Sequence, residues 1–186
     1  TAAAIASREG IEPEGVDKHI DELQQILLRD DCYLPGIPQK FNTLTLEAEL
    51  IASQGNPEPV RDGVNRQVEE DPHCWIHSSG DWIAYDFGCS EQVSEVSLVL
   101  DTSMEEDIQM HMTSSPPWGW ELPEVLPESF VIEGRRNGNW EALEQVQDNS
   151  QRLVRIPVGR ELDGVRYRLQ ETRGAEKCRL YAFYVE

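Results

Sequence analysis

Apolar residues recur at every second position in several short segments after residue 80. The clearest are residues 83–87, 96–100, 153–158 and 165–169. A period of two predicts β-strands with one face in a core, because successive side chains on a strand point to opposite faces. Residues 180–185 are apolar throughout, which predicts a last strand covered on both faces. The pair Asn137-Gly138 is typical of a two-residue hairpin turn.

The first 35 residues carry a helical pattern instead. Residues 2–6 (Ala-Ala-Ala-Ile-Ala) favour a helix and are apolar all round, so this helix requires burial on several sides. A second helix is predicted to begin at Asp17 as its N-cap. Its apolar stripe consists of Val16, Ile20, Leu23 and Leu27. The composition of residues 36–45 predicts a linker, and a first strand is expected from Leu46 onward.

Composition favours one all-β domain with an attached segment. The chain has 186 residues, with 11 Pro and 13 Gly spread between the alternating segments. Its net charge of −19 would repel phosphate backbones and anionic lipid, so we expect neither nucleic-acid nor membrane binding. No apolar run approaches the roughly 20 residues needed to cross a bilayer. The four cysteines lie far apart, which favours buried thiols over a disulfide framework.

A motif in the first alternating region carries a family resemblance. Residues 82–88 read Trp-Ile-Ala-Tyr-Asp-Phe-Gly and are followed by the alternating residues 96–101. This arrangement resembles the galactose-binding-like superfamily, which includes the discoidin and coagulation-factor type C modules. The resemblance implies a mainly β chain, with a jelly-roll β-sandwich over residues 46–186 preceded by a short α-helical segment.

A second resemblance involves the helical region. Residues 1–6 (Thr-Ala-Ala-Ala-Ile-Ala), 9–17 and 23–35 are similar to the end of the flavin-binding domain in bacterial FAD-dependent oxidoreductases. Residues 126–133 and 151–157 are similar to the sandwich appended to the same enzymes. The resemblance implies that residues 1–35 are the helical tail of a truncated flavin-binding domain.

The flavin-contacting segments of that family precede the matching region. We therefore expect no cofactor and no enzymatic activity in this chain, with FAD held by the parent protein. The missing N-terminal flavin domain is the expected partner, and the source is expected to be bacterial, with no compartment indicated. An uncovered apolar helix also predicts a homodimer through residues 1–30.

Trp118 and Trp120 form the best candidate binding surface. They lie in a proline-rich loop that extends from Thr102 to about Pro127. Two such rings can stack on a sugar, anchor the sandwich on the parent domain, or pack locally. The main interpretation is a non-catalytic accessory module that packs on the catalytic domain or shapes substrate access. The alternative is a carbohydrate-binding module that uses these tryptophans.

Other candidate chemistry is weaker. Asp62-Gly63 occupies the place of a calcium-binding loop in sugar-binding relatives, but the position of a second carboxylate is taken by Ala182. Asp-Gly is also good turn chemistry, so Asp62 is only a weak calcium candidate. His73-Cys74-x-x-His77, with Cys89 further on, lacks the regular paired spacing of zinc sites. No nucleophile motif is present, so no catalytic residue is predicted.

Overall fold

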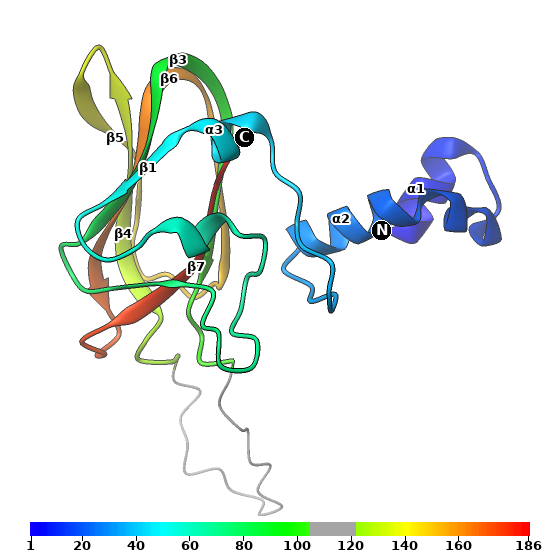
Figure 1. Cartoon of the computed structure of the whole chain (residues 1–186), viewed down its shortest axis with the longest axis horizontal. Coiled ribbons are helices and arrows are strands. Elements are labelled where there is room, and N and C mark those ends of the chain that lie inside the picture. The colour runs from blue at the N-terminus through cyan, green and yellow to red at the C-terminus, as the bar shows by residue number, and fades with distance from the viewer. Residues whose placement is uncertain (105–121) are drawn as a thin grey trace, which may run out of the picture.

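A computed structural model describes residues 1–104 and 122–186. Figure 1 shows a β-sandwich with a helical segment set to one side. The elements are α1 (Ala2–Glu9), η1 (Pro13–His19), α2 (Ile20–Arg29), α3 (Thr43–Glu47), β1 (Glu49–Ala52), η2 (Glu58–Arg61), β2 (Trp75–His77), β3 (Trp82–Leu100), β4 (Pro127–Arg136), β5 (Asn139–Val146), β6 (Leu153–Thr172) and β7 (Cys178–Val185). The predicted jelly-roll β-sandwich with a preceding helical segment is confirmed.

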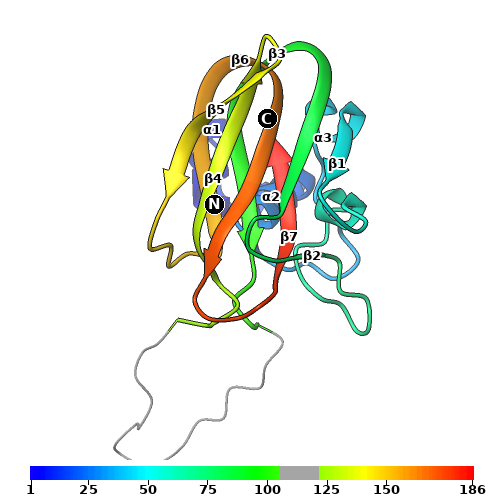
Figure 2. The same cartoon turned by 90° about the vertical axis from the view of Figure 1, so that its left-hand side faces the viewer.

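Two long, bent strands join the layers of the sandwich. β3 pairs antiparallel with β6 along both halves of its length, and the register shifts between Asp86 and Glu91. The first half of β3 lies beside β1, whereas its second half pairs with β7. Gly88, with φ of 71°, lies in the irregular stretch between the halves. The predicted strands 83–87 and 96–100 are therefore the two halves of one strand, because the chain bends without leaving its partner β6 (Figure 2).

The bend creates two layers. The β5 layer contains β1, the first half of β3, the second half of β6, β4 and β5. The β7 layer contains β2, β7, the second half of β3 and the first half of β6. The core between them is formed by inward residues of the alternating segments, among them Tyr85, Leu98, Phe130, Tyr167 and Phe183, each fully buried. The Tyr85 hydroxyl donates to the Phe183 carbonyl at 2.8 Å, so this buried polar atom is satisfied.

The predicted hairpin is also confirmed. β4 and β5 are joined through Asn137 and Gly138, whose φ angles are 50° and 79°. Two successive positive φ angles suit the twist of the flanking strands, and Asn and Gly adopt them most readily.

Residues 36–45 pack along the outer face of the β7 layer rather than forming a free tether. The ring of Phe41 lies 4.5 Å from that of Tyr184, and Gln39 and Thr45 are buried. Thr45 Oγ1 donates to the Val185 carbonyl at 2.9 Å and accepts from the Val185 amide at 3.0 Å. Residues 36–45 cover one face of β7 and the core covers the other. This agrees with the prediction, from the apolar residues 180–185, of a last strand covered on both faces.

The start of the first strand differs from the prediction. Asn42 accepts a hydrogen bond from the Thr45 amide at 3.1 Å and thereby caps the short helix α3. The chain becomes extended only at Glu49, where β1 begins. The alternation from Leu46 to Ala52 is thus divided between a helical turn and a strand, because a local side-chain cap competes with strand pairing.

The helical segment has a small core of its own. Ile5 and Ala6 of α1 are buried with Val16 of η1, while Ala2 and Ala3 are exposed. Part of the apolar first helix, Ile5 and Ala6, therefore packs within the segment, whereas the burial on several sides that its sequence predicts is not present in the described residues. The predicted N-cap at Asp17 is wrong, because η1 runs through this residue directly into α2. Within the described residues, no helix is long and apolar enough to cross a membrane.

Candidate functional site

Trp118 and Trp120 lie outside the described residues, but the two stems of their loop are described. β3 ends at Leu100 and the returning chain is anchored at Leu126, and both leucines are fully buried in the core. The Leu126 carbonyl accepts from the Arg173 amide at 3.3 Å. Asn149 donates to the Pro127 carbonyl at 3.1 Å, which fixes the first residue of β4. The stems are therefore held by the sandwich itself.

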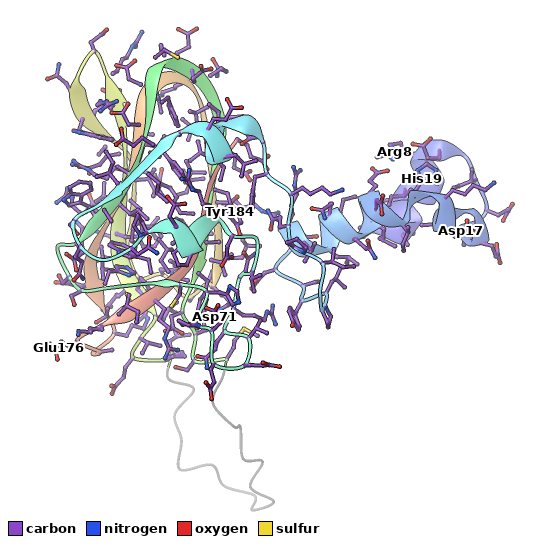
Figure 3. The ribbon with its side chains drawn as sticks, in the orientation of Figure 1. Arg8, Asp17, His19, Asp71, Glu176 and Tyr184 are labelled. Carbon is purple, nitrogen blue, oxygen red and sulfur yellow. The ribbon has the colours of Figure 1, made fainter. Side chains whose placement is uncertain are left out.

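Both stems lie at one end of the sandwich, away from α1. In Figures 1 and 2 the end of β3 and the beginning of β4 emerge together at the bottom of the view, and in Figure 1 α1 lies to the side and higher. The buried residues of α1 pack within the helical segment. In Figure 3 the labelled Asp17 and His19 lie on the outer part of the segment, beside α1 and away from the sandwich.

Asp62 is engaged by its own surroundings. One carboxylate oxygen accepts from the Val64 amide at 2.8 Å, and the other lies 2.6 Å from His73 Nδ1. Ala182, at the position expected for a second carboxylate, is fully buried in β7. Within residues 1–104 and 122–186, no group of three or more His, Cys, Asp or Glu is arranged to hold a metal. Both oxygens of the Asp62 carboxylate thus have partners at residues 64 and 73, as in a turn, and its role as a calcium ligand stays a weak prediction.

The His73-Cys74-x-x-His77 motif is divided between different environments. His73 faces Asp62, whereas His77 is fully buried and stacks on Trp75 with ring centroids 4.4 Å apart. Cys74 belongs to the buried cluster on the outer face of the β7 layer. Cys89 is exposed in the bend of β3. The motif therefore does not form a single site.

The structure instead brings His77 beside two core residues that the sequence pattern did not single out. His77 Nε2 lies 3.2 Å from the Tyr167 hydroxyl and 3.3 Å from Cys178 Sγ. Burial lowers the pKa of His77 to about 4, which keeps the imidazole neutral. Burial also raises the pKa of the Cys178 thiol, so this group is not an activated nucleophile. The cluster satisfies polar groups in the core.

The outer face of the β5 layer carries a second feature that the sequence analysis missed. The Arg166 guanidinium lies 4.4 Å from the ring centroid of Trp140 and 5.7 Å from that of Trp82. Glu133 accepts from Arg166 at 2.6 Å and from Arg168 at 3.1 Å. Burial would raise the pKa of Glu133, but these two hydrogen bonds outweigh it and hold the pKa below its ordinary value.

The signal for this face was present in the alternation of residues 165–169. Arg166 and Arg168 occupy the outward positions of that strand. Which residues they meet depends on the register of β6 with β3 and β4, which no local pattern specifies. Trp75 is a core residue, whereas Trp82 and Trp140 are half-buried on this outer face.

The chain matches no protein-family model and no curated protein sequence. Solved structures with a similar fold include the family 32 carbohydrate-binding module of Streptococcus pneumoniae EndoD, with a TM-score of 0.54 and 11% identity over 75% of this chain and 94% of that one. The family 32 module of Clostridium perfringens NanJ, solved with galactose, gives a TM-score of 0.53 at 11% identity over 76% and 95% of the two chains. Chitosan-binding module 1 of a Paenibacillus sp. IK-5 chitosanase/glucanase gives 0.52 at 17% identity over 77% and 97%.

These likenesses agree with the predicted galactose-binding-like jelly roll. At such low identities they establish the fold alone. The comparisons lend no support to the FAD-dependent parent, the missing flavin domain or the homodimer through residues 1–30. These three expectations stay predictions.

Proposed function

We propose that this chain is a non-catalytic carbohydrate-binding module in which Trp118 and Trp120 stack on the sugar. The support comes from the fold, because the similar solved structures include modules in complex with galactose and with chitotriose. A ring with a flat apolar face is suited to the apolar face of a pyranose. With a net charge of −19, the chain favours neutral or amino-bearing glycans over acidic ones.

The observation that carries this proposal is the placement of the loop stems. Leu100 and Leu126 root the loop in the core at the end of the sandwich, away from α1. Docking of the two tryptophans on a parent domain would instead favour stems that continue the apolar surface of Ala2–Ala6. Ile5 and Ala6 of that helix already pack against Val16 of η1, and its exposed residues Ala2 and Ala3 lie apart from the loop stems.

The accessory-module interpretation is a second candidate, and one observation favours it. The helical segment is held against the sandwich by ion pairs at the end of α2, where Arg152 Nε lies 2.6 Å from Asp31 and Arg155 Nη2 lies 2.9 Å from Asp30. This attachment would fix the sandwich relative to any domain that continues from α1. The parent would then be an FAD-dependent oxidoreductase with the cofactor in its own flavin domain.

A glycan-array screen of the full chain followed by calorimetric titration tests the sugar proposal. The variant is Trp118→Ala/Trp120→Ala, and the matched control is Trp140→Ala. Trp140 follows the hairpin at the far end of β4 from the loop stem, so its loss leaves the loop untouched. We expect saturable binding that the double variant loses and the control retains.

Other outcomes of this screen are equally informative. Binding that is lost only in Trp140→Ala would contradict the loop as the site and point to the β5 layer. A screen in which the intact chain binds no glycan would overturn the sugar proposal and leave the accessory module as the leading account.

The homodimer through residues 1–30 is tested by light scattering of the full chain and of a chain without residues 1–29. We expect two chains per particle for the full chain and one for the shortened chain. The same number of chains per particle in both samples would contradict the homodimer.

A further inference from the structure

A pocket of about 320 Å³ lies where the end of the helical segment meets the sandwich. One wall is supplied by residues 28–38 and the other by residues 63–73. Its apolar lining comes from Leu28, Leu34, Ile37, Pro38, Val64 and Val68. Ligand pockets span roughly 300–1,000 Å³, so this one has room for a single small molecule.

Arg66 supplies the charged group of the lining. Its guanidinium lies 5.0 Å from the ring centroid of Tyr33, which also lines the pocket. Its Nη2 donates to the Asp31 carbonyl at 2.8 Å. A guanidinium has five N–H donors, so this bond leaves others for a ligand.

The carboxylates near the pocket have partners of their own. Asp31 Oδ2 lies 2.6 Å from Arg152 Nε, and Asp31 Oδ1, which is buried, lies 3.7 Å from Arg66 Nη2 in a longer ion pair. Asp62 is paired with His73 at 2.6 Å. Asp71 lies 3.8 Å from His73 Nε2, but its side chain is 70% exposed and is screened by water. The Arg66 guanidinium is therefore the charge that a ligand in the pocket meets directly.

Two residues of the pocket lining, Gly63 and His73, have special backbone conformations. Gly63 has φ of 90°, and a Cβ there would lie 2.9 Å from the Gln39 carbonyl oxygen and 3.0 Å from Pro38 Cβ, so the two walls approach closely at this glycine. His73 has φ of 42°, an unfavourable conformation for a residue other than glycine. Hydrogen bonds to Asp62 and from its own amide to Asp71 hold it there. Strained residues held in this manner are concentrated at binding sites.

We propose that this pocket binds a small amphipathic acid, with an apolar body against the leucine, isoleucine and valine side chains and one anionic group on Arg66. The predominantly apolar walls offer few partners for the hydroxyl groups of a sugar. The inference therefore adds a second ligand class and does not depend on the carbohydrate proposal.

The test uses two probes of nearly the same shape, 2-naphthoate and the uncharged 2-naphthamide. Binding to the full chain is measured by isothermal titration calorimetry. We expect one naphthoate per chain and at least about tenfold weaker binding of the amide, because hydrogen bonds to a charged group are the stronger ones.

Three variants assign the site. Arg66→Gln should reduce the affinity for naphthoate to that for the amide. Arg160→Gln makes the same change of charge at an exposed arginine of β6, where its pairing partner is Glu141 at 3.8 Å, and should leave both affinities unchanged. Val68→Trp should fill the pocket and abolish binding of both probes, with its melting temperature measured to show that the chain is folded.

Three results would overturn the proposal. The first is no saturable binding of naphthoate by the unmodified chain. The second is equal affinity for naphthoate and naphthamide, which would remove the role of the anionic group. The third is undiminished naphthoate binding by a folded Val68→Trp variant, which would place the ligand elsewhere.

Discussion

Acidification should destabilise the sandwich through His77. This side chain is fully buried, with its ring stacked on Trp75 and Nε2 close to Tyr167 and Cys178. Burial lowers its pKa from the ordinary 6.5 to about 4, although a hydrogen bond to the Trp75 carbonyl partly opposes this shift. The unfolded chain therefore binds a proton more readily than the folded chain in this pH range. Stability is fully present above pH 6.5 and is lost as the pH falls toward 4.

The size of the effect follows from the two pKa values. Between them, the free energy of unfolding falls by about 1.4 kcal/mol per pH unit. Integrated from pH 7.5 to pH 5, the loss from this one histidine is about 2 kcal/mol. That is a large share of the stability of an ordinary domain, which is roughly 5–15 kcal/mol.

The measurement is guanidinium chloride unfolding at pH 7.5 and pH 5, followed by tryptophan fluorescence under reducing conditions. His77→Gln removes the titrating group, so its stability should change by about 2 kcal/mol less between the two pH values than that of the unmodified chain. His19→Gln is the matched control, because His19 lies on the helical segment outside the sandwich core. It should retain the original pH dependence. An equal fall in stability for His77→Gln and the unmodified chain would refute the reasoning.

Three further predictions concern stability, each measured as a free energy of unfolding. Gly63→Ala should lower the free energy of unfolding by about 1–3 kcal/mol more than Gly80→Ala does. Both glycines have φ near 90°, but only a Cβ at Gly63 would lie within 3 Å of backbone. Equal losses of stability would contradict the close approach at Gly63. Glu133→Gln should lower the free energy of unfolding by about 1–3 kcal/mol, because Arg166 and Arg168 lose the carboxylate that they both donate to. A change near zero would contradict a stabilising role of Glu133. Asp31→Asn should lower the free energy of unfolding by about 1–3 kcal/mol, because Asp31 and its partner Arg152 are largely buried. Asp30→Asn should lower it by less than about 1 kcal/mol, because the pair of Asp30 with Arg155 is exposed. The reverse order would contradict the role of the largely buried Asp31–Arg152 pair.

The alternating residues determined most of the sandwich by themselves. Their period of two specified which side chains face the core, and this is why Tyr85, Leu98 and Tyr167 are buried as the pattern predicts. Asn137-Gly138 determined its hairpin because the turn depends on local φ angles. Signals of this kind depend on a residue and its near neighbours, so they can be read without knowing the fold.

Contacts across long sequence separations were decided only by the tertiary structure. The joining of residues 83–87 and 96–100 into one bent strand depends on their shared partner β6, which is distant in the chain. The pairing of Asp62 with His73 and of Asp31 with Arg152, and the placement of His77 beside Cys178, likewise depend on how loops and strands meet. The pocket at Arg66 exists because residues 28–38 return to the loop at Gly63. Periodicity specifies the face of an element but not its neighbour, since neighbours are set by register and packing over the whole chain.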